Sequence, residues 1–207
     1  GLTEDLTKLF NQLSGFAPQS TYSRLLVAPK SLRAALIEKI DREIVHARAG
    51  KAAQIRLKLN SILDEEFVEK FYEASAAGVK IDLLVRGICS VQAGVPGLSE
   101  NITARSVLGR FLEHSRIFYF LNDGEEEYWI GSADLMHRNL DRRVECLVRI
   151  HNQSHIDQLK EILDIGLSDE TQSWHLNGQM WKRRSVSETG TLLLDAHSHH
   201  LKENPKG

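Results

Sequence analysis

Residues 53–85 carry the pattern that most restricts how this chain can fold. Residues 53–60 alternate apolar and polar side chains, as a half-buried β-strand does. Residues 64–77 then follow a helical pattern that ends at Gly78, and residues 79–85 form a mostly apolar strand. A strand, a helix and a strand joined by short connections form a βαβ unit. The pattern therefore predicts two parallel strands within a mixed sheet.

The remaining chain adds elements of the same α/β class. Its 207 residues, 42% of them hydrophobic, can bury a sizeable core as one domain. From residue 182 onward the chain is polar, which predicts a flexible tail over residues 182–207. We expect one domain over residues 1–181, with residues 1–22 as a leading helix and linker. Further strands are expected at residues 24–28, 102–107, 116–121, 128–131 and 144–150, and helices at residues 31–49 and 155–167.

Polar side chains follow both strands of the βαβ unit. Arg86 comes directly after the second strand and begins a loop that contains glycine and proline. In open α/β sheets, ligands collect at this edge, although a solvated arginine is the simpler alternative. Lys58 and Asn60 leave the first strand at a comparable edge. For these two residues, contact with an anionic ligand and simple exposure are both open.

Residues 110–143 place a histidine two positions before a cation. His114 and Arg116 precede the apolar run 117–121, and a second apolar run ends in a Gly-Ser turn at residues 131–132. This pattern predicts a β-hairpin with an imidazole and a guanidinium at one end and a small-residue turn beside them. An imidazole, a guanidinium, a hydroxyl and free backbone N–H groups are suited to hold and attack a phosphoryl group.

Charged residues continue downstream of the turn. A charge run is usually a solvated face, but its place after a phosphate-type turn favours a role in the site. Glu145 lies between two apolar residues on an expected strand. If it points inward it needs a partner such as Arg86, Arg143 or His114, and we expect it to orient a cation or an imidazole.

The hairpin segment resembles one half of a phospholipase D active site, written H-x-K-x4-D and followed by G-S. It differs at two positions, since Arg116 replaces the lysine and Leu121 replaces the aspartate. The segments VKIDLLVRGICS, GVPGLSENI, GRFLEHSRIFYF and GSADLMHRNLDRRVE resemble the C-terminal catalytic domain of bacterial polyphosphate kinase. This second resemblance runs from about Thr3 to Ile150.

The resemblance implies an α/β fold with a phospholipase D-like mixed β-sheet flanked by helices. It also implies reversible transfer of the terminal phosphate of ATP to inorganic polyphosphate, with Mg²⁺ accompanying ATP. Two tandem domains would each supply a histidine. The upstream histidine becomes phosphorylated, and His114 matches the second, which assists transfer as an acid or phosphate ligand. Because the upstream histidine is missing here, the isolated chain is expected to be inactive.

The candidate site residues fall into three groups, and none is predicted to bind a metal directly. His114 is the candidate catalytic residue. Residues expected to orient the ligand-contacting side chains are Glu145, Asp134 and Arg116. Residues expected to contact ATP or phosphate are Arg86, His114, Lys58, Asn60, Ser132, Arg138 and Arg142. The histidines at residues 197, 199 and 200 form a weak metal site, because no cysteine supports them.

Composition limits the partners and the compartment. A net charge of −2 gives no general attraction to nucleic acid or anionic membranes, so a polyanion must meet a local cationic cluster. Cys89 and Cys146 suggest no disulfide framework, and no apolar run approaches the roughly 20 residues that span a bilayer. We expect a protein of the bacterial cytoplasm. The resemblance to the family further implies that the partners include upstream domains of the same protein, that the full-length enzyme is a homo-oligomer, and that peripheral membrane association is possible.

Two other functions remain open. The first is a phospholipase D-like phosphodiesterase or nuclease that completes its site by homodimerisation, although the replaced lysine and aspartate argue against it. The second is a non-catalytic module that binds polyanions. Hydrolysis of bis(p-nitrophenyl) phosphate would distinguish the first alternative, and polyphosphate binding that does not need His114 would distinguish the second.

Overall fold

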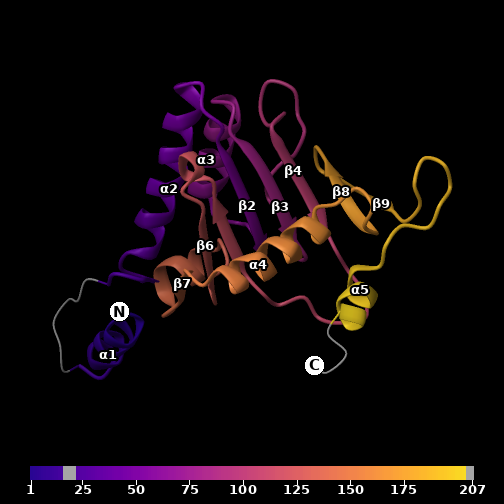
Figure 1. Cartoon of the computed structure of the whole chain (residues 1–207). Helices are drawn as coiled ribbons and strands as arrows, with labels where there is room; N and C mark the ends of the chain where they lie inside the picture. Colours follow the sequence, from indigo (N-terminus) through magenta and orange to yellow (C-terminus); the bar gives the residue numbers. More distant parts are fainter. Residues whose placement is uncertain (16–21, 204–207) are drawn as a thin grey trace.

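The computed structural model describes residues 1–15 and 22–203, which are built around one mixed sheet (Figure 1). The strand order in this sheet is β1-β7-β6-β5-β2-β3-β4-β8-β9. The strands are β1 (Leu25–Val27), β2 (Gln54–Leu59), β3 (Lys80–Val85), β4 (Ile102–Ser106), β5 (Ile117–Phe120), β6 (Glu127–Gly131), β7 (Cys146–Ile150), β8 (Ser173–Asn177) and β9 (Met180–Arg184). The helices are α1 (Leu2–Leu13), α2 (Leu32–Arg48), α3 (Glu65–Ala76), α4 (Gln153–Gly166) and α5 (Ala196–Glu203), with a 3₁₀ turn η1 (Asn122–Gly124) and a π-helical turn η2 (Arg138–Arg142).

The predicted βαβ unit is confirmed. β2 and β3 pair in parallel, with Leu57 opposite Leu83, and α3 connects them. Asp64 caps α3 by accepting a hydrogen bond from the backbone N–H of Phe67, and Gly78 follows the helix with a φ of 96°. β4 extends the parallel set, whereas the other neighbouring strands are antiparallel. The predicted mixed sheet flanked by helices is therefore correct.

Alternation along β5 shows how helices cover both faces of the sheet. Phe118 and Phe120 belong to the main core beneath α2 and α3, whereas Ile117 and Tyr119 pack under α4 (Figure 1). Fully burying each such side chain stabilises the fold by roughly 1.5–3 kcal/mol. Within the described parts of the chain, none of the helices is both long and apolar enough to cross a membrane.

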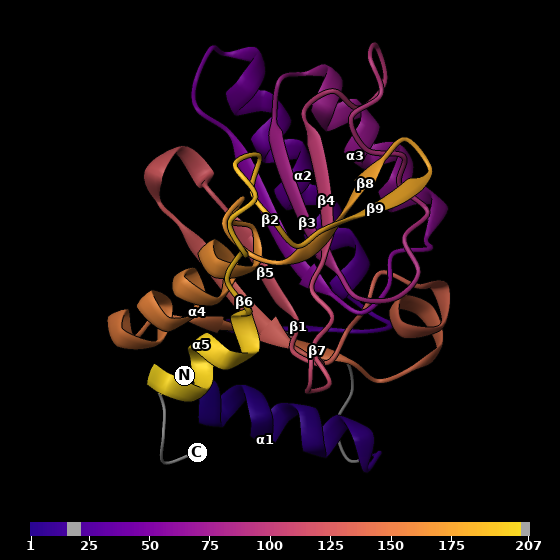
Figure 2. The same cartoon turned by 90° about the vertical axis from the view of Figure 1, so that its right-hand side faces the viewer.

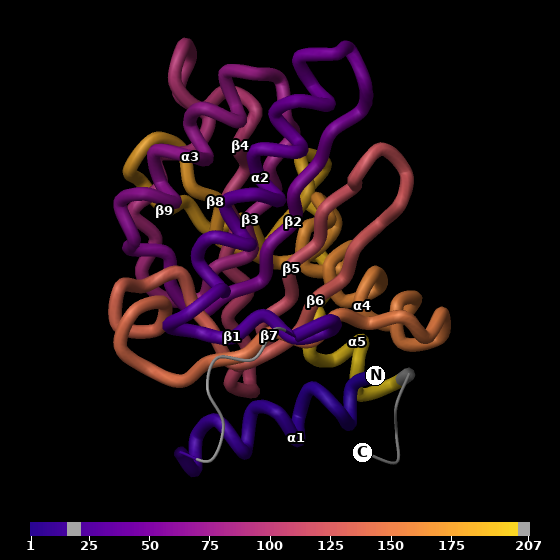
Figure 3. The backbone as a smooth tube through the Cα atoms, turned by 90° about the vertical axis from the view of Figure 1, so that its left-hand side faces the viewer, coloured from indigo at the N-terminus to yellow at the C-terminus, as the bar shows by residue number. Residues whose placement is uncertain are grey.

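The N-terminal helix α1 packs on the β1 edge of the sheet (Figure 3). Leu9 is buried against β1, and the carboxylate of Asp5 accepts hydrogen bonds from the backbone N–H groups of Ser23 and Arg24 at 2.9 and 2.6 Å. This agrees with the predicted leading helix. Most of the predicted linker, residues 16–21, lies outside the described residues.

The flexible tail predicted over residues 182–207 does not hold for residues 182–203. β9 pairs with β8 in a hairpin at the edge of the sheet, and α5 follows after two isolated bridges (Figure 2). These elements escaped detection because an exposed edge strand and a short polar helix show no continuous apolar face. Residues 204–207 lie outside the described residues.

Candidate functional site

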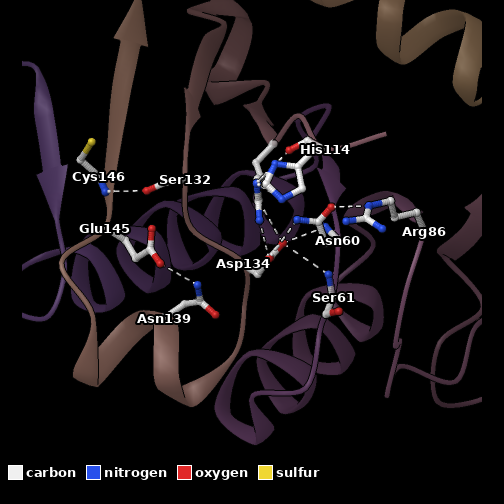
Figure 4. A network of polar contacts seen from close by, with 10 residues as sticks. Asn60, Ser61, Arg86, His114, Ser132, Asp134, Asn139, Glu145 and Cys146 are labelled. Atoms are coloured by element: carbon white, nitrogen blue, oxygen red, sulfur yellow. Dashed lines mark hydrogen bonds and ion pairs between the residues drawn. The ribbon is translucent and has the colours of Figure 1, made fainter. Parts of the chain in front are cut away.

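Five strand ends meet at one edge of the sheet. Asn60 follows β2 and Arg86 follows β3, so both lie at the carboxyl edge of these parallel strands. β5 is antiparallel to β2, which brings His114, ahead of β5, to the same edge. Ser132 follows β6 and Glu145 precedes β7, and their antiparallel pairing places both residues there as well. The topology thus gathers side chains from distant parts of the sequence (Figure 4).

These side chains surround a cavity of about 470 Å³. Eight of the predicted site residues line it, together with five residues that were not among them. The predicted ones are Asn60, Arg86, His114, Arg116, Ser132, Asp134, Arg138 and Glu145, and the additional ones are Ser61, Gly87, Met136, Asn139 and Arg143. Of the latter, only Asn139 and Arg143 had a sequence signal, because they belong to the charge run after the Gly-Ser turn.

Asp134 is the polar centre of the cavity wall. Its Oδ1 accepts hydrogen bonds from the backbone N–H groups of Asn60 at 2.7 Å and Ser61 at 3.3 Å. Its Oδ2 accepts from Arg116 Nη2 at 2.9 Å and from Asn60 Nδ2 at 3.1 Å. Burial alone would raise the pKa of this carboxyl, but the hydrogen bonds from Arg116 and Asn60 outweigh it and lower the pKa. Asp134 is therefore an ionised anchor for the end of β2.

Arg116 connects this anchor to the imidazole of His114. Its Nη1 lies 3.0 Å from His114 Nδ1 and donates to the His114 carbonyl oxygen at 2.8 Å. The same Nη1 lies 3.4 Å from His114 Nε2. A guanidinium carries only donors, so the ring nitrogen that takes this bond is an acceptor, and the other ring nitrogen can hold a proton. His114 is exposed and lines the cavity, so it can present a ring N–H donor to a bound oxygen.

Arg86 is fixed by one nitrogen and open at the others. Its Nε donates to Asn60 Oδ1 at 2.5 Å, and neither Nη group has a hydrogen-bond partner in residues 1–15 and 22–203, so both can bind a ligand. The next residue, Gly87, donates its N–H to the Asn60 carbonyl at 2.8 Å. A Cβ at this position would lie 2.7 Å from that oxygen, so the close approach of β2 and β3 excludes a side chain.

The Gly-Ser turn is held against β7. Ser132 donates its N–H to the Cys146 carbonyl at 3.1 Å, and its Oγ accepts from the Cys146 N–H at 3.3 Å. A Cβ on Gly131 would lie 1.9 Å from the Cys146 carbonyl oxygen, so only glycine fits. Backbone contacts thus fix the exposed Ser132 at the cavity rim.

Glu145 has a different partner from those predicted. Its Oε1 accepts from Asn139 Nδ2 at 2.8 Å rather than from Arg86, Arg143 or His114, because η2 turns Asn139 toward the start of β7. Both side chains are buried, and Asn139 Oδ1 has no hydrogen-bond partner within the described residues. The pair leaves acceptor oxygens beside the cationic groups of the cavity.

Two predicted phosphate ligands lie elsewhere. The Nζ of Lys58 is buried and donates to Glu113 at 2.6 Å and to Ser115 at 2.7 Å, so it does not line this cavity. Arg142 is exposed on η2 and does not line it either. Arg138 and Arg143 do line it, and their side chains form no hydrogen bond or ion pair with the described part of the chain. The open cationic groups are therefore Arg86, Arg138 and Arg143.

Comparisons with known proteins agree on one family. Residues 25–192 match the family model described as polyphosphate kinase C-terminal domain 2. A polyphosphate kinase of Streptomyces coelicolor is 57% identical over 191 residues, which cover 91% of this chain and 26% of that protein. One from Thermosynechococcus vestitus is 48% identical over 197 residues, covering 95% and 27%. The solved polyphosphate kinase of Porphyromonas gingivalis has a TM-score of 0.85 and 33% identity, covering 97% of this chain and 31% of that one.

The extent of these matches defines what the chain contains. It spans about a quarter of the length of the curated relatives, and the family model covers most of it. Three of the four segments that carried the sequence resemblance contribute residues to the cavity at the sheet edge, and GVPGLSENI does not. The chain therefore belongs to the polyphosphate kinase family, in the part described as C-terminal domain 2.

Proposed function

We propose that this chain supplies one half of an active site that reversibly transfers the terminal phosphate of ATP to inorganic polyphosphate. The observation that carries this proposal is the cavity lined by His114 and by three guanidinium groups that have no carboxylate partner among the described residues, those of Arg86, Arg138 and Arg143. Such groups compensate the charge of crowded phosphates. Membership in the polyphosphate kinase family supports the same substrates.

The phosphorylated histidine of the proposed reaction lies in an upstream domain. In the first step its ring nitrogen forms a bond to the terminal phosphorus of ATP, the bond to the bridging oxygen breaks, and ADP leaves with that electron pair. In the second step a terminal oxygen of polyphosphate forms the new bond and the nitrogen–phosphorus bond breaks. Two such steps replace one difficult transfer.

His114 and Arg86 assist both steps from this chain. A ring N–H of His114 donates a hydrogen bond to a phosphoryl or leaving oxygen, while Arg116 contacts the other side of the residue through its ring and its backbone carbonyl. Arg86 binds two phosphate oxygens through its Nη groups, and Asn60 fixes its orientation. Donors that are already oriented need no rearrangement as charge develops on the phosphoryl group.

Mg²⁺ is expected to arrive with ATP, and the oxygens at one side of the cavity fit it. Mg²⁺ prefers carboxylate and carbonyl oxygens and keeps several waters. Asp134 is committed to Arg116 and Asn60, whereas Glu145 and the unpartnered Oδ1 of Asn139 offer such oxygens. Glu145 and Asn139 would hold the ion or its waters, and the ion would neutralise phosphate charge.

The test joins this chain to its upstream region and follows the terminal phosphate of ATP into acid-insoluble polymer. His114→Ala should lower the rate at least 100-fold, as expected for loss of an acid–base group. His155→Ala, which removes an exposed histidine from α4, should leave the rate unchanged. The 207-residue chain alone should form no polymer.

Three results would contradict the proposal. Near-normal polymer synthesis by His114→Ala would make this residue architectural. Robust synthesis by the chain alone would show that no upstream histidine is needed. No polymer from the folded wild type would end the kinase proposal, and hydrolysis of bis(p-nitrophenyl) phosphate would then test the phosphodiesterase alternative.

A further inference from the structure

The segment that carries His114 has little support of its own. Residues 107–116 connect β4 to β5 without regular secondary structure. Leu108, Phe111 and Leu112 on this segment are 49–74% exposed, so apolar packing holds it weakly. A second cavity, of about 530 Å³, lies between this segment, α4 and α5 and leaves room behind it. Specific bonds must therefore fix the orientation of His114.

His197 on α5 makes such bonds. Its side chain is only 4% exposed, its Nδ1 accepts the backbone N–H of Phe111 at 3.0 Å, and its Nε2 lies 2.8 Å from Glu113 Oε1. Because Nδ1 is an acceptor, Nε2 carries the proton and donates to Glu113. A Cβ on Gly109 would lie 2.6 Å from the ring, so the segment lies flat against the imidazole at that glycine.

Lys58 completes the arrangement from β2. Its Nζ donates to the second carboxylate oxygen of Glu113 at 2.6 Å and to Ser115 Oγ at 2.7 Å. The two neighbours of His114 in sequence are therefore bound to the same buried ammonium group. Burial would raise the pKa of Glu113, but Lys58 and His197 outweigh it and lower the pKa, so Glu113 is ionised.

We infer that His197, Glu113 and Lys58 form a clamp that fixes His114 over the cavity, which makes His197 a positioning residue for the proposed phosphoryl transfer. The inference rests on the proposed function for its catalytic consequence and on geometry for the clamp itself. Bonds on both sides of His114 restrict the direction in which its ring leaves the backbone. A reacting group displaced by about 1 Å can lose two orders of magnitude in rate.

The catalytic test compares three histidine variants in the protein that includes the upstream region. His197→Ala should lower kcat roughly 10- to 100-fold and change the KM for ATP less than about threefold, because the lost interaction positions His114 rather than binding substrate. His197→Gln keeps a donor toward Glu113 and should recover part of kcat. His199→Ala, on the same helix but 31% exposed and 3.9 Å from Glu161, should behave as wild type.

A second readout in the 207-residue chain separates the clamp from the kinase proposal. Hydrogen exchange of the Phe111 amide should accelerate in His197→Ala and not in His199→Ala. Tripolyphosphate should shift the ring signals of His114 in the wild type, and His197→Ala should lose this shift. These measurements do not depend on phosphoryl transfer, so they test the clamp even if the wild-type protein makes no polymer.

Two outcomes would overturn the inference. The first is wild-type kcat in His197→Ala together with a faster-exchanging Phe111 amide, because α5 would then be an anchor without effect on His114. The second is a retained His114 ring shift in folded His197→Ala. Should His197→Ala fail to fold, as judged by its thermal transition, Glu113→Gln replaces it, because it weakens the same bonds without emptying the buried site.

Discussion

Two buried carboxylates at opposite ends of the β5–β6 hairpin show how similar groups serve different purposes. Glu127 begins β6 at the turn end, where Lys39 donates to one carboxylate oxygen at 2.6 Å and Arg42 to the other at 2.9 Å. Trp129 Nε1 adds a hydrogen bond at 3.0 Å, and the ammonium of Lys39 lies 4.6 Å from the ring centroid of the same tryptophan. The cations at this end point at the carboxylate.

Asp134 follows β6 at the other end of the hairpin, where its cationic partner also contacts a second side chain. Arg116 bonds Asp134 on one side and His114 on the other, so the carboxylate reaches the ring through one guanidinium. Arg138 and Arg143 nearby face a cavity instead of a carboxylate. In a structural ion pair the donors of the cation are used by the carboxylate, whereas a binding site keeps donors that can contact a ligand. This difference predicts distinct responses to substitution.

The largest effect is expected for Asp134→Ala. Removing the carboxylate leaves the largely buried Arg116 without its partner, and the backbone N–H groups of the two residues after β2 without an acceptor. Breaking a buried pair in this way costs about 3–5 kcal/mol of unfolding free energy. Chemical denaturation measures this loss, and calorimetry should show weaker tripolyphosphate binding in the same variant. A loss below about 1 kcal/mol with normal binding would remove the distinction between the two ends.

Glu127→Gln should reduce stability and leave tripolyphosphate binding unchanged. Burial would raise the pKa of Glu127, but Lys39 and Trp129 lower it from 4.5 to about 2. A lowered folded-state pKa stabilises the fold above pH 4.5, and this contribution is lost as the pH falls toward 2. At about 1.4 kcal/mol for each pKa unit, it amounts to roughly 3 kcal/mol.

Denaturation at several pH values measures this contribution. The wild type should lose more stability than Glu127→Gln between pH 4.5 and 2, so that the two proteins converge in acid. Parallel pH profiles would mean that Glu127 contributes nothing through its charge. Weaker tripolyphosphate binding by the variant would show instead that the substitution at the turn end changes the structure of the cavity.

The smallest effect is expected for Arg138→Ala, measured against Arg142→Ala. Both arginines lie on η2 and are exposed, but only Arg138 lines the cavity. Loss of one phosphate contact should weaken tripolyphosphate binding about tenfold, or about 1.4 kcal/mol. Arg142→Ala removes the same charge and should weaken binding less than twofold. Equal effects would mean that general charge, and not position at the cavity, sets the affinity.

The elements predicted correctly from the sequence are those in which the spacing of apolar residues follows the face that is buried. The alternation of β2 and the helical spacing of α3 are such cases, because each buries one face against the core. The strand ends of the βαβ unit and the motif around His114 predicted residues that the structure places around one cavity, and their role in a site stays a prediction. Asn60 and Arg86 lie at that edge because parallel strands end on the same side of a sheet.

Other features depend on contacts that no local pattern records. The alternation of β2 places Lys58 on its polar face, where contact with a bound anion was expected. Lys58 instead binds Glu113, which lies 55 residues away in the sequence. The burial of His197 depends on Gly109 and Phe111, which belong to a loop without periodicity. Glu145 pairs with Asn139 only because η2 turns there. Each case is a tertiary contact between groups whose local sequence is equally compatible with exposure.

The carboxylate of Asp134 acts as a resident counterion at the end of β2. It occupies the two backbone N–H groups and the guanidinium of Arg116 that would otherwise attract a free anion. That part of the wall therefore carries its own counterion, whereas Arg86, Arg138 and Arg143 line the same cavity without a carboxylate partner among the described residues. An ion that contacts more than one of these guanidinium groups at once should bind more tightly than an ion that contacts a single one. A chain of linked phosphates offers more oxygens for such contacts than a single inorganic phosphate does.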